Sequence, residues 1–198
     1  MKKLQILAIS GSLRKASYNS AAINALKFLA PSDVEIVIGE IGDLPLFNPD
    51  RENEHIPSLL KLKNALDKSS GLILATPEYA HGISGPLKNA LDWLVSGKEF
   101  PYKPIMLINT SPRASHAQAS LKEVLITMSG NLIDNAHVSV PLLSSELDSV
   151  GIIKNEKIAN ILSLGLSEFC SAIKTQKLNK QFKSAGVGTL DVKKNHIQ

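Results

Sequence analysis

The sequence predicts an α/β protein built on one doubly wound, five-stranded parallel sheet with helices on both faces. Short continuous apolar runs, typical of strands buried on both sides, alternate with segments whose apolar residues repeat at helical spacing. Five such strands fit the flavodoxin order 2-1-3-4-5, in which a ligand crevice opens between strands 1 and 3. The predicted strands are residues 4–9, 34–38, 72–75, 105–109 and 136–140, and the predicted helices are residues 20–29, 56–67, 86–95, 115–128 and 154–173.

Length and composition indicate a single globular domain. The chain has 198 residues, of which 43% are hydrophobic and 20% charged. This length suits one well-buried core and is too short for two. We expect one domain over residues 1–175, followed by a lysine-rich C-terminal tail over residues 176–198. The single cysteine, Cys170, is expected to pack in the core.

The charge distribution argues against nucleic acid as a partner. The formal net charge is +4, but residues 150–198 carry eight lysines against three acidic residues, which leaves the preceding body at −1. The lysine-rich stretch has no arginine for bidentate contacts and little aromatic content. No apolar run approaches the ~20 residues of a membrane span, and the N-terminal apolar run is too short for a secretory signal. We therefore expect a cytoplasmic protein with no membrane partner.

The segment after the first strand has the groups that hold a terminal phosphate. Ser12, Ser17 and Asn19 supply hydroxyl and amide groups, Arg14 supplies a cation, and the first amides of a helix follow. The chain lacks both the G-x-G-x-x-G fingerprint and the G-x-x-x-x-G-K-[ST] cradle, which disfavours a dinucleotide Rossmann site and a nucleoside triphosphatase. The same residues equally suit simple capping of the helix beside an exposed arginine.

A second candidate loop follows the third strand. It begins Pro77-Glu78-Tyr79-Ala80-His81, is rich in Gly, Ser and Pro, and leads into an amphipathic helix. Open α/β sheets bind their ligands at the carboxyl ends of the strands, so two such loops are expected to converge on one ligand.

Taken together, the two loops resemble the NADPH-dependent FMN reductase family of flavodoxin-like quinone, azo and chromate reductases. Residues 11–19, GSLRKASYN, match the family's G-S-L-R-x-x-S-x-N loop. Pro77-Glu78-Tyr79, followed by Gly85 and by LKNALDW at residues 87–93, matches P-E-Y-N…P-G-x-L-K-N-A-I-D-W. The similarity extends over about residues 1–173. Ala80 is a departure, since the family usually has Asn there.

The resemblance implies an FMN cofactor, with NAD(P)H as co-substrate and a small acceptor such as a quinone, azo compound, free flavin or metal oxyanion. It also implies a homodimer or homotetramer in which a second subunit covers the flavin. Hydride transfer through a flavin needs no protein nucleophile, so no catalytic residue and no metal are expected. The resemblance implies that the flavin phosphate is held by the loop after the first strand, through Ser12, Leu13, Arg14, Ser17, Tyr18 and Asn19. It implies that the edge of the flavin ring lies along Pro77, Glu78, Tyr79 and Ala80, and that Ser111, after the fourth strand, makes a third contact.

Two other functions compete with the enzyme. One is a flavodoxin-type electron-transfer module, which would usually be acidic where it docks its partners, unlike this nearly neutral body. The other is a non-catalytic phosphate-binding or interaction domain. Flavin absorbance would exclude the second, and NAD(P)H oxidation in the presence of a quinone would separate the enzyme from the module.

Overall fold

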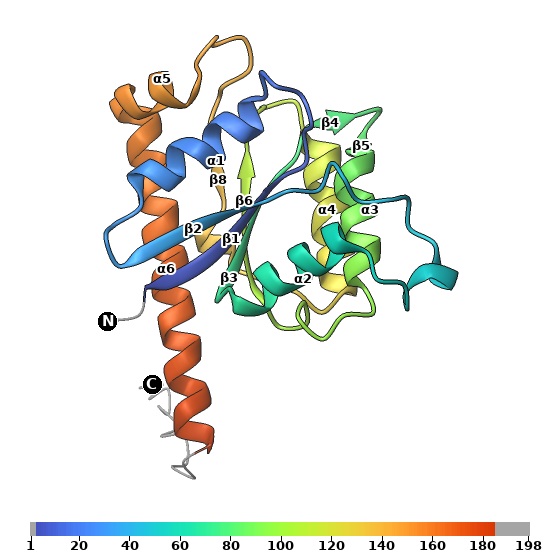
Figure 1. The fold of residues 1–198 in the computed structure, drawn as a ribbon. Coiled ribbons are helices and arrows are strands. Elements are labelled where there is room, and N and C mark those ends of the chain that lie inside the picture. The colour runs from blue at the N-terminus through green and yellow to red at the C-terminus, as the bar shows by residue number, and fades with distance from the viewer. Residues whose placement is uncertain (1–2, 185–198) are drawn as a thin grey trace, which may run out of the picture.

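The computed structural model describes residues 3–184 and has three layers, with a parallel sheet between two layers of helices (Figure 1). The strands follow the order β2-β1-β3-β6, and β7 and β8 both pair with β6 at the far edge. This confirms the predicted order 2-1-3-4-5. The four long strands are β1 (Leu4–Ser10), β2 (Val34–Gly39), β3 (Gly71–Ala75) and β6 (Pro104–Asn109).

The fifth strand differs from the prediction of one strand over residues 136–140. It consists of two short pieces, β7 (Asn131–Leu132) and β8 (Val138–Ser139), separated by the 3₁₀ helix η2 (Asp134–Ala136). β7 pairs with the start of β6 and β8 with its end. The polar residues in and around η2 favour local backbone turns over a continuous ladder, which explains the interruption.

The helices divide between the two faces of the sheet (Figure 1). Helices α1 (Tyr18–Leu29), α5 (Ser149–Lys154) and α6 (Glu156–Ser184) cover one face, and α2 (Pro57–Lys68), α3 (Gly85–Leu94) and α4 (Ser115–Thr127) cover the other. Successive residues of a strand point to opposite faces, so β1 contributes to both cores. Ile6 and Ala8 pack in the α1/α6 core, whereas Leu7 and Ile9 pack in the α2/α3 core.

The C-terminal helix is longer than predicted. We expected it to end at residue 173, but α6 continues to Ser184, so the domain boundary expected at residue 175 falls inside a helix. Its lysines contact the body, since Lys174 Nζ lies 3.2 Å from Asp33 Oδ2 and Lys177 Nζ lies 2.7 Å from Ser70 Oγ. Residues 185–198 of the expected tail lie outside the described residues. Cys170 is buried in the core as predicted, and burial raises the pKa of its thiol.

Two further features complete the described part of the chain. The connection between β2 and α2 contains the short 3₁₀ helix η1 (Pro49–Arg51), and it is anchored where Trp93 Nε1 donates to the carbonyl oxygen of Pro45 at 2.8 Å. After β3, the strands β4 (Glu78–Tyr79) and β5 (Gly82–Ile83) form a small antiparallel hairpin outside the main sheet. Within residues 3–184, no helix is long and apolar enough to cross a membrane.

Candidate functional site

A cavity of about 700 Å³ opens where the carboxyl ends of the parallel strands meet. Its volume lies within the range of small-molecule sites. The loops after β1, β3, β6 and β8 form its walls. Leu13 is outside the lining, and its side chain is 57% exposed. The ten other predicted contact residues all line the cavity: Ser12, Arg14, Ser17, Tyr18, Asn19, Pro77, Glu78, Tyr79, Ala80 and Ser111.

The first wall is the segment of residues 10–20, which we call the phosphate loop, and its own side chains organise it. Ser17 Oγ accepts a hydrogen bond from the Ser20 amide at 3.3 Å and thereby caps α1. Ser20 Oγ donates to Ser10 Oγ at 2.9 Å, and Ser10 Oγ in turn accepts from the Ser12 amide at 3.2 Å. The Arg14 amide donates to Ser12 Oγ at 3.4 Å. Capping and cavity lining therefore coexist in this loop.

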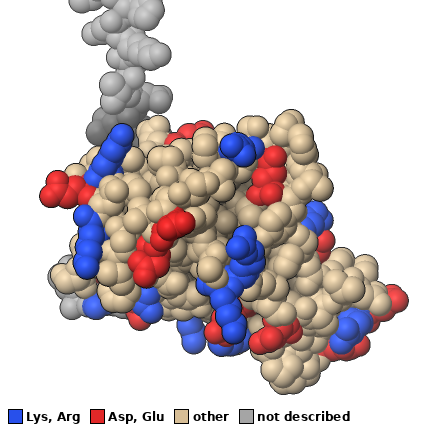
Figure 2. Space-filling model, turned by 90° about the horizontal axis from the view of Figure 1, so that it is seen from above, with Lys and Arg blue, Asp and Glu red and all other residues tan. Residues whose placement is uncertain are grey.

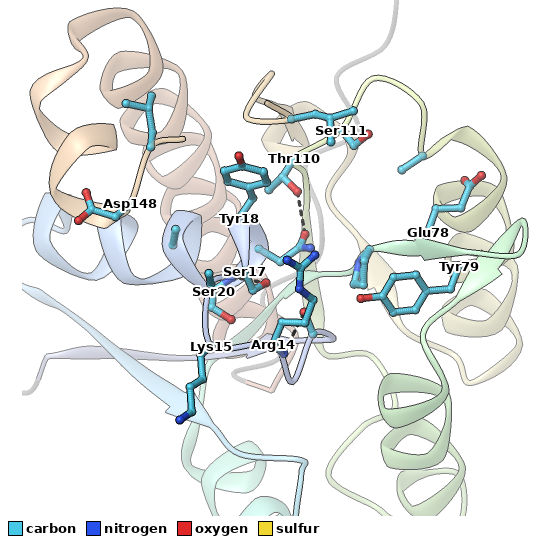
Figure 3. A pocket seen from close by; sticks show the side chains of 18 of the residues that line it. Arg14, Lys15, Ser17, Tyr18, Ser20, Glu78, Tyr79, Thr110, Ser111 and Asp148 are labelled. Atoms are coloured by element: carbon cyan, nitrogen blue, oxygen red, sulfur yellow. Dashed lines mark hydrogen bonds between the residues drawn. The ribbon is translucent and has the colours of Figure 1, made fainter. Parts of the chain in front are cut away.

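The two cations of the phosphate loop have different orientations. The Arg14 side chain extends into the space between the loop and Tyr79, whereas the Lys15 side chain points away from it (Figure 3). Within residues 3–184, Arg14 makes no salt bridge to a carboxylate. Its guanidinium can therefore direct its N–H donors at an anion in the cavity.

Thr110 links the phosphate loop to the loop after β6. Its hydroxyl donates to Asn19 Oδ1 at 3.0 Å, and both residues are buried (Figure 3). Beside it, Ser111 Oγ accepts from the Arg113 amide at 3.3 Å. Sequence reasoning named Ser111 but missed Thr110, although the position of Thr110 directly after a buried strand was a signal for it.

The β4–β5 hairpin forms the opposite wall. Its two turn residues, Ala80 and His81, have φ of 48° and 61°, the left-handed conformation of a type I′ turn. Tyr79 is about half exposed and directs its phenol toward the cavity (Figure 3). Glu78 instead holds the hairpin to α4, because its Oε2 accepts from the Ala117 amide at 2.8 Å. The imidazoles of His81 and His116 also meet, with ring centroids 4.4 Å apart.

A fourth wall was absent from the sequence-based prediction. The segment after β8 contributes Leu143 and residues 146–149 to the lining. It is tied to the phosphate loop where the Glu146 amide donates to the Tyr18 hydroxyl at 3.2 Å. Asp148 caps α5 by accepting from the Gly151 amide at 2.8 Å. The sequence did offer one signal for this wall. The segment follows the predicted fifth strand, and the carboxyl ends of all parallel strands meet at one edge of the sheet.

The charges around the cavity are mixed. Figure 2 shows the face at the carboxyl ends of the strands, where basic and acidic side chains are interspersed and no single sign dominates. The cavity is lined by three basic residues, Arg14, Lys15 and Arg113, and by three acidic residues, Glu78, Glu146 and Asp148. Such a face does not resemble the continuous basic stripe of a nucleic-acid interface.

The residues present fit a flavin mononucleotide. A terminal phosphate needs several converging donors, which the Arg14 guanidinium, the hydroxyls of Ser12 and Ser17 and the start of α1 provide at one end of the cavity. A flat ring needs a slot walled by backbone and an aromatic side chain, which the hairpin and Tyr79 provide at the other. Among the described residues, no group of three or more His, Cys, Asp or Glu could hold a metal ion.

Comparison with known proteins agrees with this geometry. The sequence profile of the NADPH-dependent FMN reductase family matches residues 4–142. An NAD(P)H-dependent FMN reductase of Pseudomonas aeruginosa is 29% identical over 165 residues, which cover 80% of this chain and 89% of that protein. A 2-hydroxy-1,4-benzoquinone reductase of Burkholderia sp. is 29% identical over 181 residues, which cover 88% of this chain and 99% of that protein.

A solved structure extends the likeness to three dimensions. FerB, a flavoenzyme NAD(P)H:(acceptor) oxidoreductase from Paracoccus denitrificans, superposes with a TM-score of 0.73 at 31% identity, covering 86% of this chain and 97% of its own. The family profile spans most of the chain, and residues from both of the family's loop motifs line one cavity. The chain therefore belongs to the NADPH-dependent FMN reductase family.

Proposed function

We propose that this protein is an FMN-dependent NAD(P)H oxidoreductase that reduces small acceptors, with quinones and free flavins as the first classes to test. The observation that carries the proposal is the cavity of about 700 Å³ in which the phosphate loop faces the β4–β5 hairpin. Family membership and the names of the relatives support the same cofactor pair and the same acceptor classes. Azo compounds and metal oxyanions are further candidate acceptors.

In the proposed complex, the FMN phosphate lies in the phosphate loop. Ser12, Ser17 and Asn19 donate hydrogen bonds to it, and Arg14 balances its charge. Leu13 takes part through its backbone only, because its side chain is exposed outside the cavity. The isoalloxazine edge lies along residues 77–80, with Ser111 as a third contact. Tyr18 supports this arrangement indirectly, through its bond to the Glu146 amide.

The chain's contribution to catalysis is positioning. Bound FMN would supply the redox chemistry that carries a hydride from the nicotinamide to the acceptor. The hairpin and Tyr79 wall the cavity opposite the phosphate loop, and the nicotinamide and the acceptor would approach in turn through the mouth of the cavity. Reacting atoms must be held about 3 to 3.5 Å apart, so a rigid wall raises the rate without any acid, base or nucleophile from the protein. Glu78 contributes to this rigidity because its bond to the Ala117 amide holds the hairpin to α4.

A single purified sample tests the proposal. We expect FMN fluorescence to be quenched on titration with the protein, and NADPH or NADH to be oxidised when FMN and 1,4-benzoquinone are both present. Omitting FMN from stripped protein is the control and should abolish turnover. Flavin binding without turnover would indicate the electron-transfer module instead, and absence of flavin binding would refute both functions.

We also propose that the protein works in the cytoplasm as a homodimer or homotetramer. The cavity is open on one side, and a second subunit would cover it, as the family resemblance implies. NADPH and NADH are supplied inside cells, which supports the location. Sedimentation velocity at micromolar concentration should show a species of at least twice the 21.3 kDa chain mass. A monomer at all concentrations would contradict the assembly.

A further inference from the structure

Ser84 joins the two ligand loops from behind the cavity wall. It lies between β5 and α3, its exposed fraction is 0%, and it is not among the residues that line the cavity. Its Oγ donates to the carbonyl oxygen of Gly11 at 2.5 Å and accepts from the Leu87 amide at 3.4 Å. One hydroxyl thus caps α3 and holds the start of the phosphate loop, 73 residues away.

Gly11 is held on both sides, by the last residue of β3 and by Ser84 in the segment that follows β3. Its amide donates to the carbonyl oxygen of Ala75 at 2.7 Å, and its carbonyl accepts from Ser84. The contact is close, because a Cβ added at Gly11 would lie 2.8 Å from Thr76 Oγ1 and 3.0 Å from Ser84 Oγ. The absence of a side chain at Gly11 lets the phosphate loop approach the β3–α3 segment this closely.

The Ser84 hydrogen bond also fixes how the phosphate loop begins. In a trans peptide the C=O and the following N–H point in opposite directions. With the Gly11 carbonyl held by Ser84, the amide of Ser12 points the other way, where it donates to Ser10 Oγ at 3.2 Å. Ser84 therefore sets the orientation of the Gly11–Ser12 peptide, and with it the position of Ser12 at the cavity.

We propose that Ser84 is a positioning residue for the FMN phosphate. It touches no part of the flavin and acts by holding the Gly11–Ser12 peptide in the orientation that presents the phosphate loop. Without this hydroxyl the peptide is held only by the bond from the Ser12 amide to Ser10 Oγ, so part of the loop must be ordered when the phosphate binds, which lowers affinity. The inference rests on the proposed FMN site.

The test compares Ser84→Ala with Ser69→Ala in titrations of stripped protein with FMN and with riboflavin, which lacks the phosphate. Ser69 is a matched control, because it is also buried and its Oγ donates to a backbone carbonyl, that of Ala65, at 2.7 Å, away from the cavity. We expect Ser84→Ala to raise the Kd for FMN about 3- to 10-fold, the scale of one hydrogen bond, with the Kd for riboflavin changed less than about 2-fold. Ser69→Ala should change neither.

The ratio of the two Kd values separates a positioning role from a merely structural one. An equal rise for FMN and riboflavin, or an unchanged Kd for FMN, would overturn the inference. A wild-type protein that binds neither flavin would instead refute the proposed function. Ser84→Cys, which preserves the side-chain shape and has only a weak donor, is the second variant and should show the same phosphate-dependent loss. It decides the question if Ser84→Ala does not fold.

Discussion

The two walls of the cavity are built in different ways. The phosphate loop is organised mainly by neighbours in sequence, since its serine hydroxyls at positions 10, 12, 17 and 20 bond within residues 10–20. Longer-range bonds from Ser84 and Thr110 then fix this locally built loop to the rest of the fold. The β4–β5 hairpin is held from a distance, because Glu78 is bonded to an amide of α4 that is 39 residues away. A wall built locally can be recognised from its sequence, whereas a wall held remotely appears only once the chain is folded.

The difference extends to backbone strain. Two consecutive non-glycine residues at the hairpin tip, Ala80 and His81, have positive φ. Such residues cost about 1 to 2 kcal/mol each relative to ordinary backbone, and they persist where surrounding contacts enforce them. In this hairpin, Glu78 is bonded to α4 and the His81 ring contacts the His116 ring. The phosphate loop has no residue of this kind among the described positive-φ positions.

The largest effect should come from the phosphate loop. We expect Arg14→Ala to weaken FMN binding by about 1.5 to 3 kcal/mol, roughly 10- to 150-fold, because it removes hydrogen bonds to a charged group. Lys27→Ala is the control, since Lys27 lies in the last turn of α1 and is not among the residues that line the cavity, and it should change the Kd much less. An unchanged FMN titration for Arg14→Ala would remove this residue from the phosphate site.

The next effect concerns the remote anchor of the hairpin. Glu78→Ala should lower the free energy of unfolding by about 0.5 to 2 kcal/mol, the scale of a lost helix cap, because the Ala117 amide loses its acceptor. Glu78→Gln keeps an acceptor and should lose less. Urea denaturation measures both, and equal stability of all three proteins would show that the hairpin does not depend on α4.

A smaller effect is expected at the strained turn. Ala80→Asn should raise the free energy of unfolding by about 0.5 to 1 kcal/mol, because Asn adopts positive φ more readily than Ala. Ala80→Val should do the opposite, since a β-branched residue is poorly tolerated there. If the strain is absent, the two variants will not differ in stability.

The same Ala80→Asn variant tests where the side chain points. If it faces the cofactors, its amide should add one hydrogen bond and improve the FMN affinity or the KM for NAD(P)H by up to about tenfold, with the quinone KM little altered. Crowding against His81 would worsen both ligand parameters. Unchanged values for every ligand would mean that residue 80 points away from the site and would contradict the placement of the ring edge along residues 77–80.

The sequence predicted the sheet well because its signal is local. Continuous apolar runs identified β1, β2, β3 and β6 to within a residue or two, and their order followed from alternation with helices. The fifth strand was less well defined, because β7 and β8 are two residues each and depend on pairing with β6. The hairpin was missed for a related reason, since its turn is Ala80-His81 and lacks the Asn-Gly pair that marks a type I′ turn in a sequence.

The candidate site shows the same division. Ten of the predicted contact residues line the cavity because the loops that carry them follow adjacent strands at one edge of the sheet. Leu13 was predicted as a contact because it belongs to the sequence motif, but its side chain lies outside the cavity. A sequence motif does not show which way a side chain points. The position of Thr110 after a buried strand marked it as a candidate, but its bond to Asn19 and the bond of Ser84 to Gly11 span 91 and 73 residues. Neither partner could be predicted from local pattern.

A crystal structure of the protein with FMN would test the central claim most directly. We predict that the phosphate contacts the phosphate loop, with the Arg14 guanidinium within hydrogen-bonding distance, and that the ring edge lies along residues 77–80 beside Tyr79. Flavin bound elsewhere, such as in the smaller pocket at the opposite end of the sheet lined by Lys98, Lys103 and Lys177, would contradict the account. So would a flavin in this cavity with its orientation reversed.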